Sequence, residues 1–469
     1  MTSIDASLPT GRETTAQLQE NDALAFRPGR AWSMVAILAL MILLSFIDRY
    51  ALTVLVGPIK HDLQLTDTQI GLLLGTAFGV FYSCVGLPLG YLVDNYNRRN
   101  LLIAGVAIWS SMTVLSGIAH NFTVLFIGRM GVGFGEAVLT PAAYSLIKDA
   151  FPENLRSRAY GVYVFGSSVG IGASLVVAGG LAHLFDGANS SHFSVLSGLS
   201  TWQYVLLVIG AAGFPIAALG LLIREPIRRD SEAGESPRIA DVLRHVRLNR
   251  RIYFPLLAVY AIWGICVYSY GAWLPTAIGR TWQVPATVVG PKYGFVTMCL
   301  APLAAVLFSL FFDRLVQARR ASRIPMYAGV ACLVVAVPTA IGPLALWPAP
   351  TWICLGISTF FSMGVQLALI VVLAQIAPGR MIGKMSAACF LCLNLVGLGL
   401  GPSLVASIAG IIGDKASAIG QALSMTVGAG WFSVGILFVW VWLGLRRQRS
   451  PRAGDAYTPC AHERDAAHS

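Results

Sequence analysis

The stretch from Ala31 to Pro58 reads AWSMVAILALMILLSFIDRYALTVLVGP, an apolar run interrupted near its middle by Asp48 and Arg49. It is long enough to cross a bilayer as a helix, because about 20 apolar residues span the hydrocarbon core. A charged side chain inside a membrane costs roughly 2.5–3.5 kcal/mol on insertion scales, so such residues usually face a protein interior or a water-filled cavity. We therefore expect Asp48 and Arg49 to find partners on other helices.

Similar apolar runs recur along most of the chain and decide its class. Apolar residues make up 56% of the 469 residues and charged residues only 12%, far from the balance of a soluble domain. The expected fold is an all-α integral membrane protein with two six-helix bundles related by pseudo-two-fold symmetry. The twelve predicted spans are 31–58, 68–93, 100–119, 122–147, 157–184, 202–223, 252–279, 288–312, 324–343, 351–376, 383–412 and 424–445.

These spans divide the chain into two bundles, two tails and a linker. The predicted tails are 1–30 and 446–469, and the predicted bundles are 31–224 and 252–445. The linker between the bundles is 225–251. In the linker, apolar residues follow the helical spacing i, i+3, i+4, i+7 among several arginines: Ile239, Val242, Leu243 and Val246. This pattern predicts a short basic amphipathic helix that lies on the membrane surface and tethers the bundles.

Basic residues give the expected orientation. They crowd both tails and every second loop, whereas the alternate loops hold scattered cations such as Lys60, Arg280, Lys292 and Lys415. By the positive-inside rule, both termini are expected in the cytoplasm. Short loops and an excess of Arg over Lys suggest a bacterial inner membrane. The net charge of +11 is thus a topology signal, and no nucleic-acid partner is expected.

The two halves carry matching loops. The string GYLVDNYNRR (90–99) places an acid at the end of the second helix and a basic pair in the tight connection that follows, and an acid–arginine pair occupies the matching place after the eighth helix. Parallel repeats of this kind are expected of a two-lobed transporter with a central cavity. An acid in this place can latch onto a neighbouring helix end in one conformation. We therefore predict a cytoplasmic gate formed by Asp94, Arg98, Arg99, Arg156, Arg158, Asp313 and Arg314.

Four motifs, in order along the chain, resemble those of one family. They are IDRY (47–50), GYLVDNYNRR (90–99), GRMGVGFGEA (128–137) and NLRSRAYG (154–161). The two-half layout and the loop motif resemble the major facilitator superfamily over nearly the whole chain, and the four motifs together resemble its Spinster family. The resemblance implies transport by alternating access, with lysophospholipids or phosphorylated sphingoid bases as the substrate class.

Arg129 and Glu136 of the fourth helix are the expected partners of the charges on the first. They lie seven residues apart, so they share a face with their Cα atoms about 10 Å apart. Helices 1 and 4 line the central cavity in the superfamily that the chain resembles. The economical arrangement pairs Asp48 with Arg129, and pairs Glu136 with Arg49 or leaves Glu136 alone in the cavity.

We predict that these four residues couple substrate to protons. Asp48 or Glu136 would take up a proton while Arg129 or Arg49 alternates between a carboxylate and an anionic substrate. Burial disfavours the charged form of a carboxyl group and a nearby guanidinium favours it, so breaking an ion pair can drive protonation. The alternative is a buried ion-pair network that only fixes the packing of the helices.

The second half contains almost no charge away from its helix ends. Its aromatic and amide side chains are predicted to line the cavity: Tyr268, Tyr270, Trp273, Phe360, Phe390 and Asn394. This asymmetry suits an amphipathic substrate, with its polar head against the first half and its apolar tail against the second. We therefore expect a monomeric secondary transporter that moves a lipid-like anion, coupled to protons.

Other functions stay open at this point. A proton-coupled symporter of small organic anions would show several converging cations and no long apolar slot. A non-transporting receptor would show no counterflow of a bound ligand. A membrane enzyme is not favoured, because the sequence shows no cluster of metal ligands and no histidine in the middle of a predicted span. We expect neither an enzymatic activity nor a cofactor.

Overall fold

The computed structural model describes residues 27–187, 198–226, 228, 239–345, 347–378, 381–413 and 415–449. Within these ranges, twelve helical segments are long and apolar enough to cross a membrane. Each predicted span coincides with one of the twelve. The all-α fold with twelve spans is therefore confirmed, whereas most of the two predicted tails and part of the linker lie outside the described residues.

The first six spans form one group, and several begin at clear capping residues. Thr66 and Gln69 form a capping box, and Asn97 and Asn121 cap the two helices that follow them, satisfying free backbone N–H groups. The elements are α2 (Pro28–Asp62), α3 (Asp67–Gly71) with the π-helical turn η1 (Leu72–Thr76) and α4 (Ala77–Asn95), α5 (Arg98–Gly117), α6 (Phe122–Glu136) with α7 (Leu139–Ala150), α8 (Glu153–Gly187), and α9 (Thr201–Leu219) with η3 (Gly220–Leu222).

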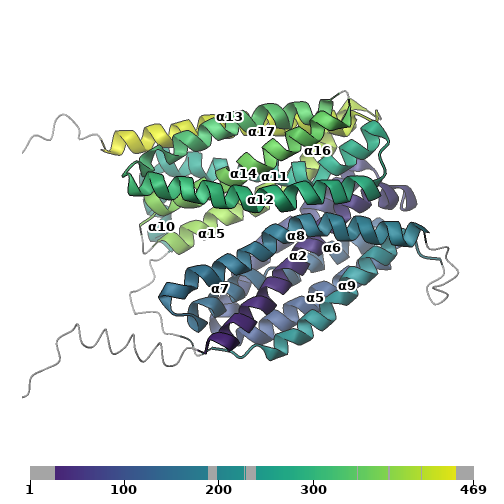
Figure 1. The fold of residues 1–469 in the computed structure, drawn as a ribbon, viewed down its shortest axis with the longest axis horizontal. Coiled ribbons are helices and arrows are strands. Elements are labelled where there is room, and N and C mark those ends of the chain that lie inside the picture. The colour runs from purple at the N-terminus through teal and green to yellow at the C-terminus, as the bar shows by residue number, and fades with distance from the viewer. Residues whose placement is uncertain are drawn as a thin grey trace, which may run out of the picture.

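The second group follows a short linker helix, α10 (Ile239–Leu248), which packs on α11 and α15 through the buried Val242. Figure 1 shows the two groups side by side, in purple to teal and in green to yellow. The elements of the second group are α11 (Arg250–Trp282), α12 (Ala286–Gln317), η4 (Ala321–Arg323) with α13 (Ile324–Ile341) and η5 (Gly342–Leu344), α14 (Pro348–Ile376), α15 (Ile382–Cys392) with the π-helical turn η6 (Leu393–Leu398) and α16 (Gly399–Ile412), and α17 (Ala418–Arg449).

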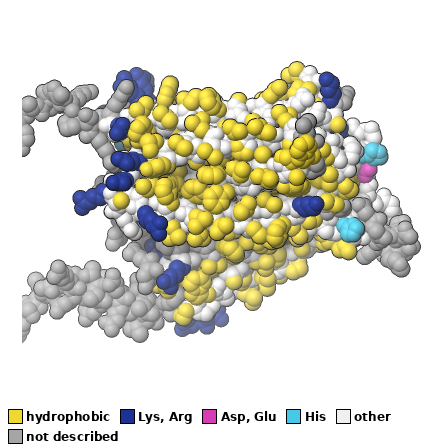
Figure 2. Space-filling model, turned by 45° about the horizontal axis from the view of Figure 1, so that its top comes forward, with side chains coloured by type: hydrophobic (Ala, Val, Ile, Leu, Met, Phe, Trp, Pro, Cys, Tyr) yellow, Lys and Arg dark blue, Asp and Glu magenta, His cyan; other side chains and the backbone are white. Residues whose placement is uncertain are grey.

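The molecule has two distinct ends. The helix that begins the described chain and the helix that ends it both reach the same end, which we call the terminal face, and the other end is the opposite face (Figure 1). In Figure 2 the Lys and Arg side chains gather mainly at the terminal face, and the surface between the two ends is largely apolar. Exposed basic residues of this face include Arg158, Arg244, Arg247, Arg314, Arg319, Arg320 and Arg323.

The two groups pack closely in the half of the molecule next to the opposite face. A Cβ atom added at Gly79 of α4 would lie 2.7 Å from the backbone nitrogen of Gly399 in α16. A Cβ atom added at Gly294 of α12 would lie 2.4 Å from the carbonyl oxygen of Gly172 in α8. Both seams therefore require glycine, because a side chain would push the backbones apart.

Three glycines of α4, Gly79, Gly86 and Gly90, form a stripe that has no close neighbour toward the terminal face. Gly86 and Gly90 follow Gly79 by seven and eleven residues, so all three lie on one face of the helix. A Cβ atom added at Gly86 or Gly90 would meet no atom within 4 Å. The buried core of the second group is continuous with part of the first group. The first-group residues in this core come from the middle of the helices and from the half next to the opposite face. The groups are thus closed against each other at the opposite face and separated along this stripe at the terminal face.

Gly79→Val is expected to separate the groups at the opposite face, because its side chain would collide with the backbone of Gly399. Spin labels on Thr68 and Val288, one on each group, should then report a longer distance than in the wild-type protein. Gly90→Val, on the same stripe but with no neighbour within 4 Å, is the matched control and should leave the distance unchanged. An unchanged distance in Gly79→Val would contradict this role of the stripe.

Candidate functional site

Two ion pairs join α2 to α6 in the interior of the first group. Arg49 Nη2 lies 2.6 Å from Glu136 Oε2, and Arg129 Nη1 lies 3.5 Å from Asp48 Oδ1. This is the pairing that the sequence favoured, and we call the four residues the charged quartet. The side chains of Asp48, Arg129 and Glu136 are 0–2% exposed, whereas that of Arg49 is 10% exposed. Arg49 is therefore the most exposed member of the quartet.

Two hydroxyl groups complete the hydrogen bonding of the carboxylates. Ser45 Oγ donates to Glu136 Oε2 at 2.8 Å, and Thr113 Oγ1 of α5 donates to Asp48 Oδ2. Neither hydroxyl was predicted from the sequence. Ser45 lies one turn before Asp48 on the same helix, which was an available signal, but nothing in the sequence joins Thr113 to a residue 65 positions away.

Part of the quartet's hydrogen-bonding capacity is unused. Among the residues that the structure describes, Arg49 Nε, Arg129 Nε and Glu136 Oε1 are buried without a hydrogen-bond partner. Buried polar atoms without partners are costly, so they mark a strained or functional group in a native protein. α6 also ends at Glu136, and the chain turns before α7 begins, so this carboxylate lies at a break in the fourth span.

Aromatic rings surround the guanidinium of Arg49. Its Cζ atom lies 5.0 Å from the ring centroid of Phe46, 4.5 Å from that of Phe78 and 5.1 Å from that of Tyr82. Cation–π attraction is worth about 0.5–2 kcal/mol, with the larger values where water is excluded. These rings therefore hold the cation in place if Glu136 moves away.

The second group presents Tyr268 and Asn394 to the quartet. The Tyr268 hydroxyl donates to Asn394 Oδ1 at 3.1 Å, and this tyrosine packs against the core of the first group, within electrostatic reach of Arg49. Asn394 lies in the π-helical turn η6, and such turns are frequent at functional sites. Phe390, one turn before Asn394, is 49% exposed. Of the predicted cavity residues, Tyr268 therefore lies nearest to the quartet, with Asn394 bonded to it.

Two of the other predicted cavity residues are part of the helix packing instead. Trp273 is fully buried, and its indole N–H donates to the carbonyl of Pro402 at 2.8 Å. Tyr270 is also buried, at 7% exposure. In this conformation Trp273 is held against α16, whereas the Tyr270 hydroxyl lies beside Gly342 of η5, so neither side chain is exposed. Phe360 is half-buried and packs on Phe308 at a centroid distance of 5.4 Å.

Arg98, predicted to be part of the cytoplasmic gate, is bound by several partners in this conformation. Its side chain is 1% exposed and bonds to Asp149, to Glu225 at 2.7 Å and to the carbonyl of Pro226 at 3.0 Å. All of these partners lie in the first group or directly after it. Arg98 is therefore an anchor that fixes the loop to its own group, and nothing in the sequence indicated Asp149 or Glu225 as its partners.

The other predicted gate residues lie at the terminal face with few contacts. Asp94 is exposed and has no hydrogen bond or ion pair with another described residue. Arg158, Asp313 and Arg314 are exposed as well. The backbone N–H of Arg99 donates to Glu225 at 2.9 Å, and the Arg156 side chain donates to the carbonyl of Phe151 at 3.4 Å. Asp94 therefore forms no latch with a described residue of the second group in this conformation.

An ion bridge across the opposite face was missed in the sequence. Arg280 at the end of α11 binds Asp67 at the start of α3 through two hydrogen bonds, of 2.7 and 2.9 Å. Lys60 of α2 binds the same carboxylate at 2.7 Å. Bidentate arginine–carboxylate pairs are among the stronger ion pairs. Because Asp67 and Arg280 belong to different groups, this bridge must break when the opposite face opens.

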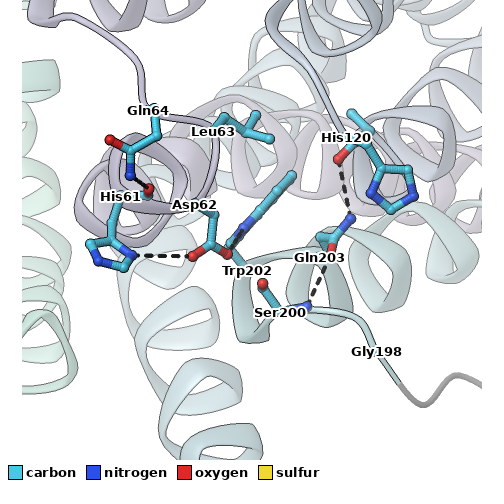
Figure 3. A pocket seen from close by; sticks show the side chains of 10 residues that line it. His61, Asp62, Leu63, Gln64, His120, Gly198, Ser200, Trp202 and Gln203 are labelled. Carbon is cyan, nitrogen blue, oxygen red and sulfur yellow. Dashed lines mark hydrogen bonds and ion pairs between the residues drawn. The ribbon is translucent and has the colours of Figure 1, made fainter.

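A separate cavity of about 410 Å³ lies at the opposite face, within the first group (Figure 3). Asp62 accepts a hydrogen bond from the Trp202 indole at 2.8 Å, and Gln203 donates to the carbonyl of Ala119 at 3.1 Å. The cavity begins at the last turn of α2, about 20 Å along the helix from Asp48. Its polar walls mainly bond to each other, so we assign it no part in the site.

Comparison with known proteins places the chain in a family. Residues 38–402 match the model of the Major Facilitator Superfamily. An "MFS-type efflux pump" of Mycolicibacterium smegmatis is 27% identical over 86% of this chain and 90% of the pump. The human "Protein spinster homolog 1" is 31% identical over 43% of this chain, which spans only 36% of that protein. A crystal structure of a bacterial homologue of Spinster, in an inward-facing and occupied conformation, has a TM-score of 0.73 at 24% identity and covers 90% of this chain and 97% of its own.

Arg280→Gln is expected to weaken closure of the opposite face, because it removes the bidentate contact between the groups. In a background without native cysteines, a cysteine at the buried Thr53 should then react faster with a membrane-impermeant maleimide added from that face. Lys60→Gln removes a contact to the same carboxylate from within the first group and is the control. Equal reaction rates in the two variants would contradict a bridging role for Arg280.

Proposed function

Because the chain belongs to the Major Facilitator Superfamily and is a Spinster-like secondary transporter rather than an enzyme, we propose that it carries an amphipathic anion together with, or in exchange for, protons. The substrate class is a lysophospholipid or a sphingoid phosphate. The observation that carries the proposal is the charged quartet, buried beside Tyr268 and Asn394 of the second group, with Arg49 as its most exposed member.

The anionic head binds Arg49 by displacing Glu136. The aromatic rings around Arg49 stay in place during this exchange. The Nε atom of Arg49, which has no partner among the described residues, offers the substrate a further donor. The apolar tail extends along the second group, toward Phe390 and the aromatic cluster of Phe308 and Phe360. A charged head site facing an apolar surface is what an amphipathic molecule requires.

Charge balance provides the coupling to protons. The quartet holds two cations and two carboxylates, so a bound anion adds an uncompensated negative charge to a buried site. Glu136 can turn to Arg129, with which it already interacts electrostatically, and Asp48 then loses its cation. A buried carboxylate without a cation takes up a proton because burial disfavours its charged form. One proton therefore accompanies each negative charge that enters.

The two faces give the direction of access. The opposite face is closed by the glycine seams and by Arg280, and Asp94 at the terminal face bonds to no other residue that the structure describes. We assign the terminal face, with its exposed arginines, to the cytoplasm of a bacterial inner membrane, so both termini are cytoplasmic. The protein works as a monomer, with the site open to the cytoplasm in this conformation.

A small organic anion is the second candidate substrate. The unpaired Nε atoms of Arg49 and Arg129 suit a compact carboxylate as well as a phosphate. The charge-balance argument is the same for either substrate. The two candidates differ in whether the apolar surface of the second group contributes to affinity.

Asp48→Asn is expected to keep substrate binding but to abolish the response to a proton gradient, because the quartet then binds an anion without needing a proton. Uptake of labelled lysophospholipid, sphingoid phosphate and a small carboxylate by proteoliposomes, with and without an inward proton gradient, measures this.

Asp62→Asn, at the opposite face and hydrogen-bonded to Trp202, is the control and should respond like the wild-type protein. An Asp48→Asn variant that still responds normally to the gradient would contradict the proposed coupling. Movement of the carboxylate alone would replace the amphipathic substrate by the small organic anion.

A further inference from the structure

Thr113 of α5 lies between two possible hydrogen-bond acceptors. Its hydroxyl is within hydrogen-bonding distance of Asp48 Oδ2 and is 3.0 Å from the carbonyl oxygen of Trp109, one turn earlier on the same helix. The residue is 1% exposed. A hydroxyl has one hydrogen to donate and lone pairs that accept, so it can serve only one of these two acceptors at a time.

The surroundings of Asp48 make this hydroxyl its nearest donor. Arg129 approaches Oδ1 at 3.5 Å, which is longer than the 2.7–2.9 Å of a typical charge-assisted hydrogen bond. Arg49 and Glu136 are the other charged groups that act on Asp48, from its own helix and from α6. From α5, the group that faces Asp48 is Thr113.

Other hydroxyls on α5 show what is particular to this one. Ser111 and Ser116 also donate to the carbonyl one turn earlier, at 2.8 and 2.9 Å, a common arrangement within helices. Neither forms a hydrogen bond to a charged group in the described residues. Thr113 combines this backbone bond with a carboxylate on a different helix.

We propose that Thr113 is a positioning residue that lets Asp48 gain and lose its proton without leaving a buried polar atom unpaired. When Asp48 is ionised, Thr113 donates its hydrogen to Oδ2. When a proton binds Oδ2, the new O–H of Asp48 donates to Thr113 Oγ1, and the hydrogen of Thr113 turns to the carbonyl of Trp109. One proton is added, no covalent bond in the threonine breaks, and every donor keeps an acceptor.

This inference rests on the proposed coupling in that it makes Asp48 the proton site, but its test needs no substrate. Infrared difference spectra of the protein in lipid, recorded over a pH titration, show the C=O stretch of a protonated carboxylic acid. The band of Asp48 is the one that disappears in Asp48→Asn. Its intensity gives the titration midpoint, and its frequency reports the hydrogen bonds of the protonated group.

Thr113→Val should move the midpoint up by about one pH unit, a tenfold change in proton affinity, because the charge-assisted hydrogen bond that the ionised carboxylate loses is stronger than the neutral one that the protonated group loses. The band should also shift to higher frequency, because the protonated group loses its acceptor. Thr113→Ser keeps the hydroxyl and should restore both values. Thr113→Ala serves in place of the valine variant if that variant does not fold.

Ser110→Ala is the matched control. Ser110 lies on the same buried face of α5 and its hydroxyl has no partner in the described residues, so its removal should leave the Asp48 band unchanged. The proposal is overturned if Thr113→Val or Thr113→Ala gives the same midpoint and frequency as Ser110→Ala. It is also overturned if no band titrates in the wild-type protein that is lost in Asp48→Asn. Failure of lipid uptake with a normal Asp48 titration would instead count against the proposed function alone.

Discussion

Four ionisable side chains share a buried site, and the energetics of that site require their charges to sum to zero. Asp48 and Glu136 are balanced by Arg49 and Arg129, and three of the four are almost completely removed from solvent. An unpaired charge in such a place costs several kcal/mol. Any event that changes one member, whether an anion at Arg49 or a proton at a carboxylate, therefore has to be compensated within the quartet. The proposed coupling follows from this constraint.

The rest of the fold places the quartet where a change in its charges can affect the position of one group relative to the other. The glycine seams let the groups approach closely at the opposite face, and Asp67 with Arg280 ties them there. The Arg98 network keeps the terminal loop fixed to its own group, so a group can move as a unit. Tyr268 reaches from the second group to the neighbourhood of Arg49, which places the proposed charge exchange at the junction of the two groups.

The fold could be predicted from the sequence because span length and charge placement are local properties. The quartet could be predicted because charged residues inside apolar runs are rare, and the seven-residue spacing of Arg129 and Glu136 leaves each needing a partner from another helix. The substrate and coupling roles assigned to the quartet stay proposals.

Details that depend on helix rotation and on distant parts of the chain could not be predicted. The sequence did not show that α16 covers Trp273, or that Asp149 and Glu225 hold Arg98. Nor did it show that Thr113 lies beside Asp48. A polar residue on a helix looks the same in sequence whether it faces a neighbouring backbone or a carboxylate.

Proton uptake on anion binding tests the charge-balance account most directly. Purified protein in weakly buffered detergent, at a pH where Asp48 is ionised, would be titrated with a short-chain, singly charged lysophospholipid while an indicator dye follows the proton concentration. We predict uptake of about one proton per bound anion in the wild-type protein, and binding without uptake in Asp48→Asn. Binding without proton uptake in the wild-type protein, or the same uptake in Asp48→Asn, would contradict the account.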